Sequence, residues 1–135
     1  FERKFDIISI DIRRNIMSIS KSTQYGNINI SIDAIASLAG GVVSECYGVV
    51  GMASQKFLKD GIAELLKKEN YAKGVVVRKK EDALELDVYI VVSYGVKISE
   101  VVHEVQTRIK YVLEKSLELE FKKVNVYVQD VKVMK

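Results

Sequence analysis

The sequence predicts an α+β domain, built as a small mixed and mostly antiparallel sheet with helices packed on one face. Two observations lead to this fold class. Segments whose apolar residues recur every three or four positions, typical of helices, are interspersed with segments whose apolar residues alternate, typical of strands. In chain order these segments read β-α-β-α-β-β-α-β, without an internal repeat. The 135 residues, 48% of them hydrophobic and 29% charged, are enough for one domain with a sizeable core.

Residues 1–24 are predicted to lie outside this domain, which we expect to span residues 25–135. The first sixteen residues differ in character from the rest of the chain and precede Met17, so we interpret them as vector-derived or upstream sequence. Within them, isoleucines alternate with polar residues over 8–13, which would allow an adventitious strand. The polar residues 17–24 are expected to form a flexible lead-in.

The first helix is predicted over residues 32–46, after a short strand that contains Ile28 and Ile30. Ser31 is placed to act as the N-cap, because its hydroxyl can accept a hydrogen bond from a free N–H of the first turn. An apolar stripe at helical spacing comes next, and Gly48 ends the helix.

The remaining elements are predicted from the same two patterns. They are a buried strand at 49–52, a helix with its core at 59–68, strands at 75–80 and 84–94 joined by a tight charged turn, a helix at 99–118 and a strand at 123–129.

The strand at 84–94 is expected to turn one face to the core and leave the other open, with an uncharged surface around Tyr89 and Val91 on the open face. Tyr127 would join them if the last strand pairs nearby. Tyrosines on an open sheet face can stack nucleobases, form a protein interface, or simply be good strand formers, and all three interpretations stay open. Glu45 lies near a helix C-terminus, where a negative charge is slightly unfavourable, which hints at a salt bridge or a partner contact.

Catalytic and metal-binding chemistry finds little support in the residues. The only histidine, His103, is predicted to be solvent-exposed on its helix, and the only cysteine, Cys46, to be a small buried hydrophobe. No spacing typical of a metal site or of a nucleotide-phosphate loop is present. We therefore expect no enzyme activity, no cofactor and no metal. A single cysteine, no signal peptide and no apolar run of membrane-spanning length predict a cytoplasmic protein.

Residues 48–51 spell GxxG, the loop with which KH domains hold the RNA backbone. The two middle residues are apolar valines, whereas a loop that faces phosphates more often carries basic or small polar residues there. We interpret the segment as a helix stop followed by a backbone bend. The net charge of +3 is spread along the chain rather than gathered, so nucleic acid is not the expected partner. RNA binding, through this loop or the open sheet face, remains the alternative function.

The order and spacing of several segments resemble the alkaline-shock-protein family, also called the general stress protein family, of Gram-positive bacteria. The resemblance covers residues 25–131, with Asp33 and Ser99 standing where family members often have proline. The segments that carry it are 26–31 (GNINIS), 35–40 (IASLAG), 45–52 (ECYGVVGM), 74–77 (GVVV), 87–101 (DVYIVVSYGVKISEV), 105–106 (VQ) and 124–128 (VNVYV).

The resemblance implies a stress-associated protein with a role in cell-envelope homeostasis. It carries over no catalytic residue. It also implies a protein partner, in some members a small membrane protein, so contact with the membrane would be indirect. Together with the residues, it predicts a non-enzymatic adaptor or scaffold that acts through Tyr89, Val91, Tyr127 and Glu45. Homo-oligomerisation is left open.

Overall fold

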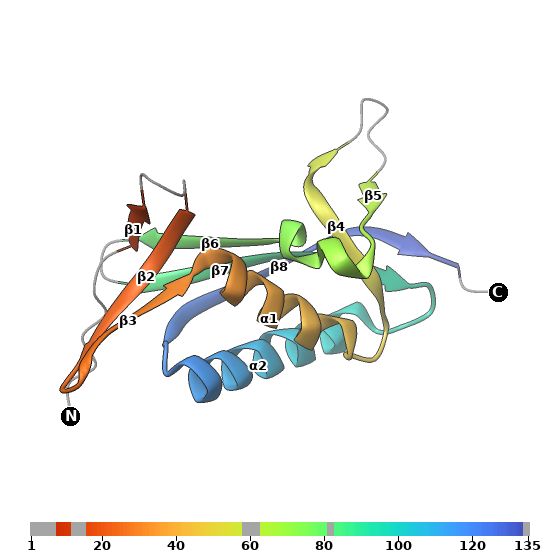
Figure 1. The fold of residues 1–135 in the computed structure, drawn as a ribbon. Helices are drawn as coiled ribbons and strands as arrows, with labels where there is room; N and C mark the ends of the chain where they lie inside the picture. The colour runs from red at the N-terminus through yellow and green to blue at the C-terminus, as the bar shows by residue number, and fades with distance from the viewer. Residues whose placement is uncertain (1–7, 12–15, 58–62, 81–82, 134–135) are drawn as a thin grey trace.

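The computed structural model describes residues 8–11, 16–57, 63–80 and 83–133 of the chain. Its main sheet is built around β7 (Ala83–Ser93), which pairs on both edges (Figure 1). β8 (Phe121–Lys132) runs parallel to β7 along one edge. The other edge is shared by two antiparallel strands, β6 (Val75–Lys80) beside the first half of β7 and β4 (Val49–Phe57) beside the second half.

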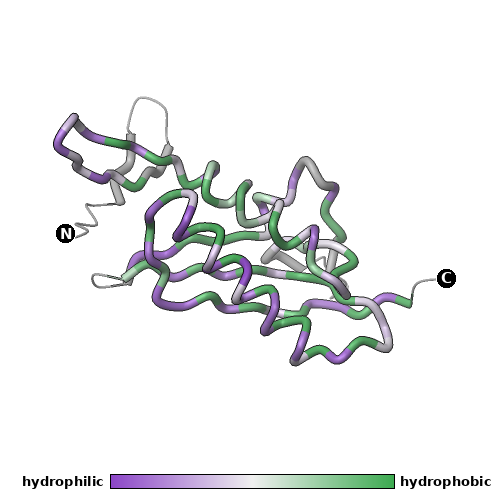
Figure 2. The backbone as a smooth tube through the Cα atoms, turned by 90° about the horizontal axis from the view of Figure 1, so that it is seen from below, coloured by the Kyte–Doolittle hydropathy of each residue, from purple (hydrophilic) through white to green (hydrophobic). Residues whose placement is uncertain are grey.

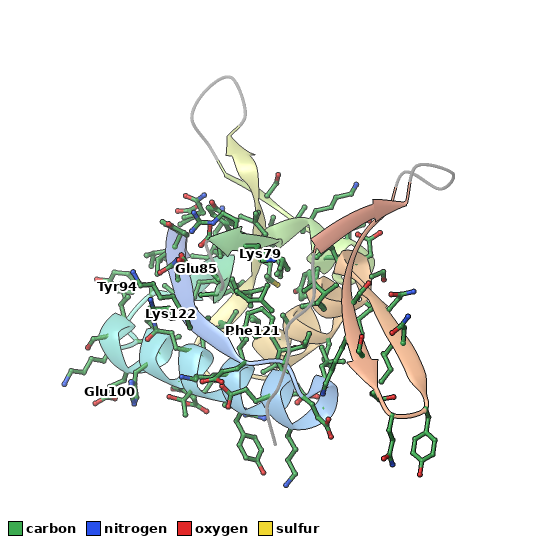
Figure 3. All side chains as sticks on the ribbon, turned by 90° about the vertical axis from the view of Figure 1, so that its left-hand side faces the viewer. Lys79, Glu85, Tyr94, Glu100, Phe121 and Lys122 are labelled. Atoms are coloured by element: carbon green, nitrogen blue, oxygen red, sulfur yellow. The ribbon has the colours of Figure 1, made fainter. Side chains whose placement is uncertain are left out.

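Both α-helices cover the same face of this sheet, as the sequence predicts (Figure 1). They are α1 (Ile32–Ser44) and α2 (Ile98–Leu117), and α2 makes the crossover between the parallel strands β7 and β8. Figure 3 shows Phe121 between the sheet and the helices, where it is fully buried. In Figure 2 the strands of the sheet are mostly hydrophobic, whereas hydrophobic and hydrophilic residues alternate along α2. The predicted α+β class and the mixed, mostly antiparallel sheet are therefore confirmed.

Several local predictions are also confirmed. Ser31 caps α1, since its hydroxyl oxygen accepts a hydrogen bond from the N–H of Ala34 at 3.0 Å. The α2 stripe faces the core through Val101, Val105, Ile109 and Leu113. The hairpin of β6 and β7 has Lys80 opposite Ala83, and the two residues between them lie outside the described part of the chain.

The N-terminal segment differs from the prediction of a flexible lead-in. Residues Ile16–Thr23 form strand β2, which pairs with β1 (Ile8–Asp11) and with β3 (Gly26–Ser31) in a separate antiparallel sheet. Ile19 of β2 is fully buried and belongs to the main core. Ser20 and Ser22 lie on the other face of the hairpin. There Ser20 donates a hydrogen bond to the side chain of Asn29 at 2.6 Å, and Ser22 donates one to the side chain of Asn27 at 3.1 Å.

The helix predicted with its core at 59–68 is wrong where the structure describes it. Ala63–Leu65 forms strand β5, antiparallel to β4, and Lys68–Gly74 forms the 3₁₀ helix η1. Residues 58–62 lie outside the described residues. The short apolar run in this segment fits the spacing of a helix as well as that of a strand. It becomes a strand because it pairs with the edge of β4. The N–H of Leu66 donates to the carbonyl of Met52 at 2.8 Å, which keeps this segment extended until η1 begins.

Candidate partner-binding surface

The face of the sheet opposite the helices carries four polar side chains that bond to one another. Arg78 of β6 donates to Asp87 of β7 at 3.0 Å and approaches Glu85 at 3.4 Å. Asn125 of β8 donates its amide to the same carboxylate of Asp87 at 2.9 Å. We call these four residues the polar network. The hydrogen bond from Arg78 to Asp87, with the attraction between their charges, raises the pKa of the guanidinium.

Strand pairing creates this network. Arg78 lies opposite Glu85 in the β6–β7 register, and Asn125 lies opposite Asp87 in the β7–β8 register. Side chains of paired residues project to the same face of a sheet, so the three strands bring the four groups together. The two carboxylates are almost entirely buried, whereas the guanidinium of Arg78 is about half exposed. Figure 3 shows Glu85 on the side of the sheet away from the helices.

Next to the polar network, Tyr89 and Tyr127 stack on each other. Their ring centroids are 4.9 Å apart and the ring planes differ by 14°. Tyr127 is 44% exposed, but Tyr89 beneath it is only 8% exposed. Burial, and after it the nearby charge of Asp87, raises the pKa of the Tyr89 hydroxyl. The stack thus exposes one aromatic ring, that of Tyr127, to solvent.

The open, uncharged face expected at Tyr89 and Val91 is therefore wrong in two respects. Val91 is fully buried and packs with Ala53 and Val50 of β4, so it is not available to a partner. The face also contains charges, because the polar network lies on it. The expectation of an open face assumed that one side of β7 meets solvent. A central strand with neighbours on both edges is instead covered by their side chains.

Glu45 lies far from this face in the fold. It follows the end of α1, is mostly exposed, and approaches Arg108 of α2 at 3.8 Å. Arg108 also approaches Glu104 at 3.9 Å. The sequence hinted at either a salt bridge or a partner contact, and the structure shows the salt bridge. At this exposure the pair adds little stability.

The GxxG segment forms no open loop. Gly48 makes the turn into β4 with a φ of +86°, and an added Cβ would approach Cγ2 of Val101 to 2.7 Å. Val49 and Gly51 already pair with β7. An open pocket of about 250 Å³ lies beside the turn, lined by Tyr47, Gly48, Val49, Val50, Ser93 and Val96. This lining has no basic side chain that would bind phosphate.

The nucleophilic and titratable residues singled out in the sequence are not brought together. Cys46 is buried, and its thiol donates to the carbonyl of Val42 at 3.4 Å. Burial raises the pKa of this thiol, which disfavours the reactive thiolate. His103 is exposed on α2, as predicted. Within the described residues, no three His, Cys, Asp or Glu side chains gather in a way that could hold a metal ion.

The two α-helices belong to the packed core of the domain. No helix within the described ranges is long and apolar enough to span a bilayer.

The fold and the surface define a small α+β domain. Among the described residues, its candidate site is the sheet surface formed by the polar network and the tyrosine stack, not a cleft lined with reactive groups. The chain belongs to the alkaline shock protein 23 family, described as having a cell envelope-related function, whose model matches residues 20–133. The family resemblance is thereby confirmed.

Relatives from two genera accompany this match. The uncharacterized protein YloU of Bacillus subtilis is 51% identical over 117 residues, which cover 87% of this chain and 98% of the relative. The uncharacterized protein Spy1614 of Streptococcus pyogenes is 51% identical over 118 residues, with the same coverage. The uncharacterized protein YqhY of Bacillus subtilis is 32% identical over 108 residues, covering 80% of this chain and 78% of the relative. No solved structure matches the chain significantly.

The polar network was missed at the level of sequence, although part of it could have been found. A hairpin turn in which Lys80 faces Ala83 fixes the register, and counting back two residues on each strand places Arg78 opposite Glu85. The position of Asn125 beside Asp87 could not be predicted in this way. β7 and β8 are parallel strands joined through α2, and a helical connection does not fix their register.

Proposed function

We propose that this chain is a non-enzymatic adaptor of the cytoplasm that serves the cell envelope by binding a protein partner at the sheet face around Tyr127. The observation that carries the proposal is the Tyr89–Tyr127 stack, held beside the polar network with one ring exposed. A partner anchored in the membrane would bring the adaptor to its inner face.

Preorganisation supports a binding role for this surface. Tyrosine and arginine are enriched among the residues that dominate protein interfaces. Tyr127 lies against Tyr89, and Arg78 is hydrogen-bonded to Asp87, so both side chains lose little freedom when a partner binds. The cell envelope-related function of the family agrees with such a role.

The composition of the face favours a protein over RNA. A tyrosine stack beside an arginine could also receive nucleobases. However, Glu85 and Asp87 put two carboxylates beneath the only arginine of the network. A phosphate backbone that approached Arg78 would therefore be repelled by these carboxylates, whereas an uncharged protein backbone or polar side chain would not be.

The test is affinity capture with three forms of the chain: the wild type, Tyr127→Ser and the control Tyr111→Ser. Tyr111 lies on α2 and is 60% exposed, so both substitutions remove an exposed tyrosine ring. A nuclease-treated Gram-positive extract in mild detergent supplies the candidates. For the captured protein, we expect Tyr127→Ser to weaken binding by about 2 kcal/mol, which is roughly thirtyfold in Kd.

The control should bind like the wild type. Equal capture by all three forms would show that the partner does not bind at this face of the sheet. If material is captured only from a parallel extract that was not treated with nuclease, the RNA alternative replaces the proposal. In that case affinity must also fall steeply with salt, because bound basic groups release counterions from phosphate.

A further inference from the structure

β8 is an edge strand, and its outer backbone groups can be assigned. Among the described residues, β8 pairs only with β7. The carbonyl of Val124 accepts a hydrogen bond from the side-chain amide of Gln106 on α2 at 2.9 Å, so this carbonyl points away from β7. Backbone groups alternate in direction along a strand. Val126 and Val128 therefore also direct their N–H and C=O groups away from β7.

Two side chains cover the ends of this edge and leave its middle bare. Gln106 covers the carbonyl of Val124, and the carboxylate of Asp130 accepts from the N–H of Val131 at 2.8 Å. Between these positions lies the run 125–128 (NVYV), which has no charged residue and no proline. It pairs with β7 in unbroken register, and the register shifts only beyond it, at Gln129. Within the described part of the chain, its backbone groups at Val126 and Val128 have no strand to pair with.

Such an edge departs from the usual protection of edge strands. Natural sheets blunt their edges with lysines, prolines or bulges, because unpaired strand groups recruit other chains. β6, which like β8 pairs only with β7 among the described strands, carries the basic run 78–80 (RKK) over its second half. β8 keeps these devices at its ends: Lys122 and Lys123 with a register shift at the start, and Lys132 after a register shift at Gln129. Its middle is left open to pairing.

We infer that the bare edge of β8 receives a short extended segment of the protein partner, which adds as a further strand beside Val126 and Val128. The inference rests on the proposed function and specifies how the partner binds. In strand addition, main-chain hydrogen bonds supply affinity, and side chains on alternating sides supply specificity. Alternate side chains of the added segment would lie beside the exposed ring of Tyr127, so the edge and the sheet face form one surface.

The length of the bare edge favours a short segment over a second copy of this chain. The four residues of this run span about 13 Å. Two copies of β8 could pair without displacing Gln106 and Asp130 only over this run, and strand pairing over so short a length buries less than the roughly 1,200–2,000 Å² of a stable protein interface. An extended segment of about four residues fits between the two covered positions and displaces neither.

The probe for the test is a linear peptide of defined sequence. Random 12-residue peptides displayed on phage are selected on the wild-type chain, and the most enriched peptide is synthesised. Amide hydrogen exchange is then measured by NMR on the intact chain, alone and with this peptide. In the free chain, the amides of Val126 and Val128 should exchange quickly, whereas that of Tyr127, which points to β7, should be protected. With the peptide bound, we expect exchange at Val126 and Val128 to slow at least tenfold.

A proline variant provides an independent readout. Val128→Pro removes an outward N–H and should be tolerated, because proline is accepted on edge strands where that N–H faces solvent. We expect it to weaken peptide binding at least tenfold. The control Val133→Pro places proline just beyond the end of β8 and should leave binding unchanged. If Val128→Pro fails to fold, the exchange pattern of the wild-type chain still decides.

The outcomes separate this inference from the proposed function. If Tyr127→Ser abolishes partner capture but the bound peptide or partner leaves Val126 and Val128 exchanging quickly, the edge is not used and only the inference is overturned. If these amides are already protected in the free chain and light scattering shows a dimer, a second copy occupies the edge and the inference is overturned as well. If capture depends on neither Tyr127 nor Val128, the proposed function loses its surface.

Discussion

Replacing Gly48 by alanine tests whether the GxxG segment is structural or free to hold a ligand. Gly48 has a φ of +86°, which costs a residue with a side chain about 1–3 kcal/mol. The new Cβ would also lie 2.7 Å from Cγ2 of Val101, a short and buried side chain that cannot swing away. Overpacking of this kind costs about 1–3 kcal/mol. Gly48→Ala should therefore destabilise the domain by about 2–6 kcal/mol.

Thermal unfolding followed by circular dichroism measures this effect. For a domain of this size, each kcal/mol shifts Tm by about 3–5 °C, so Tm should fall by at least about 6 °C. Gly41→Ala is the matched control, because Gly41 lies exposed within α1 and an added Cβ there meets nothing within 4 Å. Its better helix propensity should stabilise the domain by about 1 kcal/mol. An unchanged Tm for Gly48→Ala would refute the structural role and make this turn a candidate ligand loop.

A second substitution separates the two causes of the destabilisation. Val101→Ala removes the methyl that Gly48→Ala would strike, but it leaves the unfavourable φ in place. The double variant should therefore be less destabilised than the sum of the single variants, by about 0.5–3 kcal/mol. Strict additivity would show that the backbone conformation alone demands glycine at this position.

Four further outcomes are expected. Asp87→Ala removes the acceptor of two hydrogen bonds and should lower the free energy of unfolding, measured with urea, by about 1–3 kcal/mol. The lost bond from the half-exposed Arg78 should account for less of this change than the lost bond from Asn125. Leu86→Ala, at a fully buried position, should cost about 2–5 kcal/mol in the same assay. Because the pKa of Tyr89 is raised in the folded state, its contribution is complete below pH 10.0 and is lost as pH rises through the folded value, so Tyr89→Phe should flatten the alkaline fall of the urea midpoint. Gln106→Ala uncovers the carbonyl of Val124 and should increase concentration-dependent self-association in light scattering.

The fold could be predicted wherever the spacing of apolar residues fitted a helix or a strand but not both. The stripe from Val101 to Leu113 fits only a helix, and the alternation along β7 fits only a strand, so both elements were located within two residues. Residues 63–67 satisfied either pattern, and their state depends on the edge of β4, which is distant in sequence. The same holds for Ile19, because a single isoleucine among polar residues does not reveal that it reaches the core.

The candidate surface was predicted less well than the fold, for a physical reason. Alternation along β7 correctly assigned Tyr89 and Val91 to the face away from the helices. It could not show whether that face meets solvent, because burial there depends on side chains from three other strands. Tyr127 remains exposed because its strand is at the edge of the sheet. The distinction between a central and an edge strand was not available from local sequence.

The contrast between Tyr89 and Tyr127 also suits one pair of residues to both stability and the proposed recognition of a partner. In the central strand, Tyr89 is buried against groups that fix its position, and its rotation is limited by the ring above it. That fixed ring holds Tyr127 in one orientation at the margin of the sheet, next to the bare backbone of Val126 and Val128. A side chain held in place loses little entropy on binding, and an unpaired backbone gains hydrogen bonds on binding. Both effects favour the same small region, so a partner that used the exposed ring without the adjacent edge would leave those hydrogen bonds unmade.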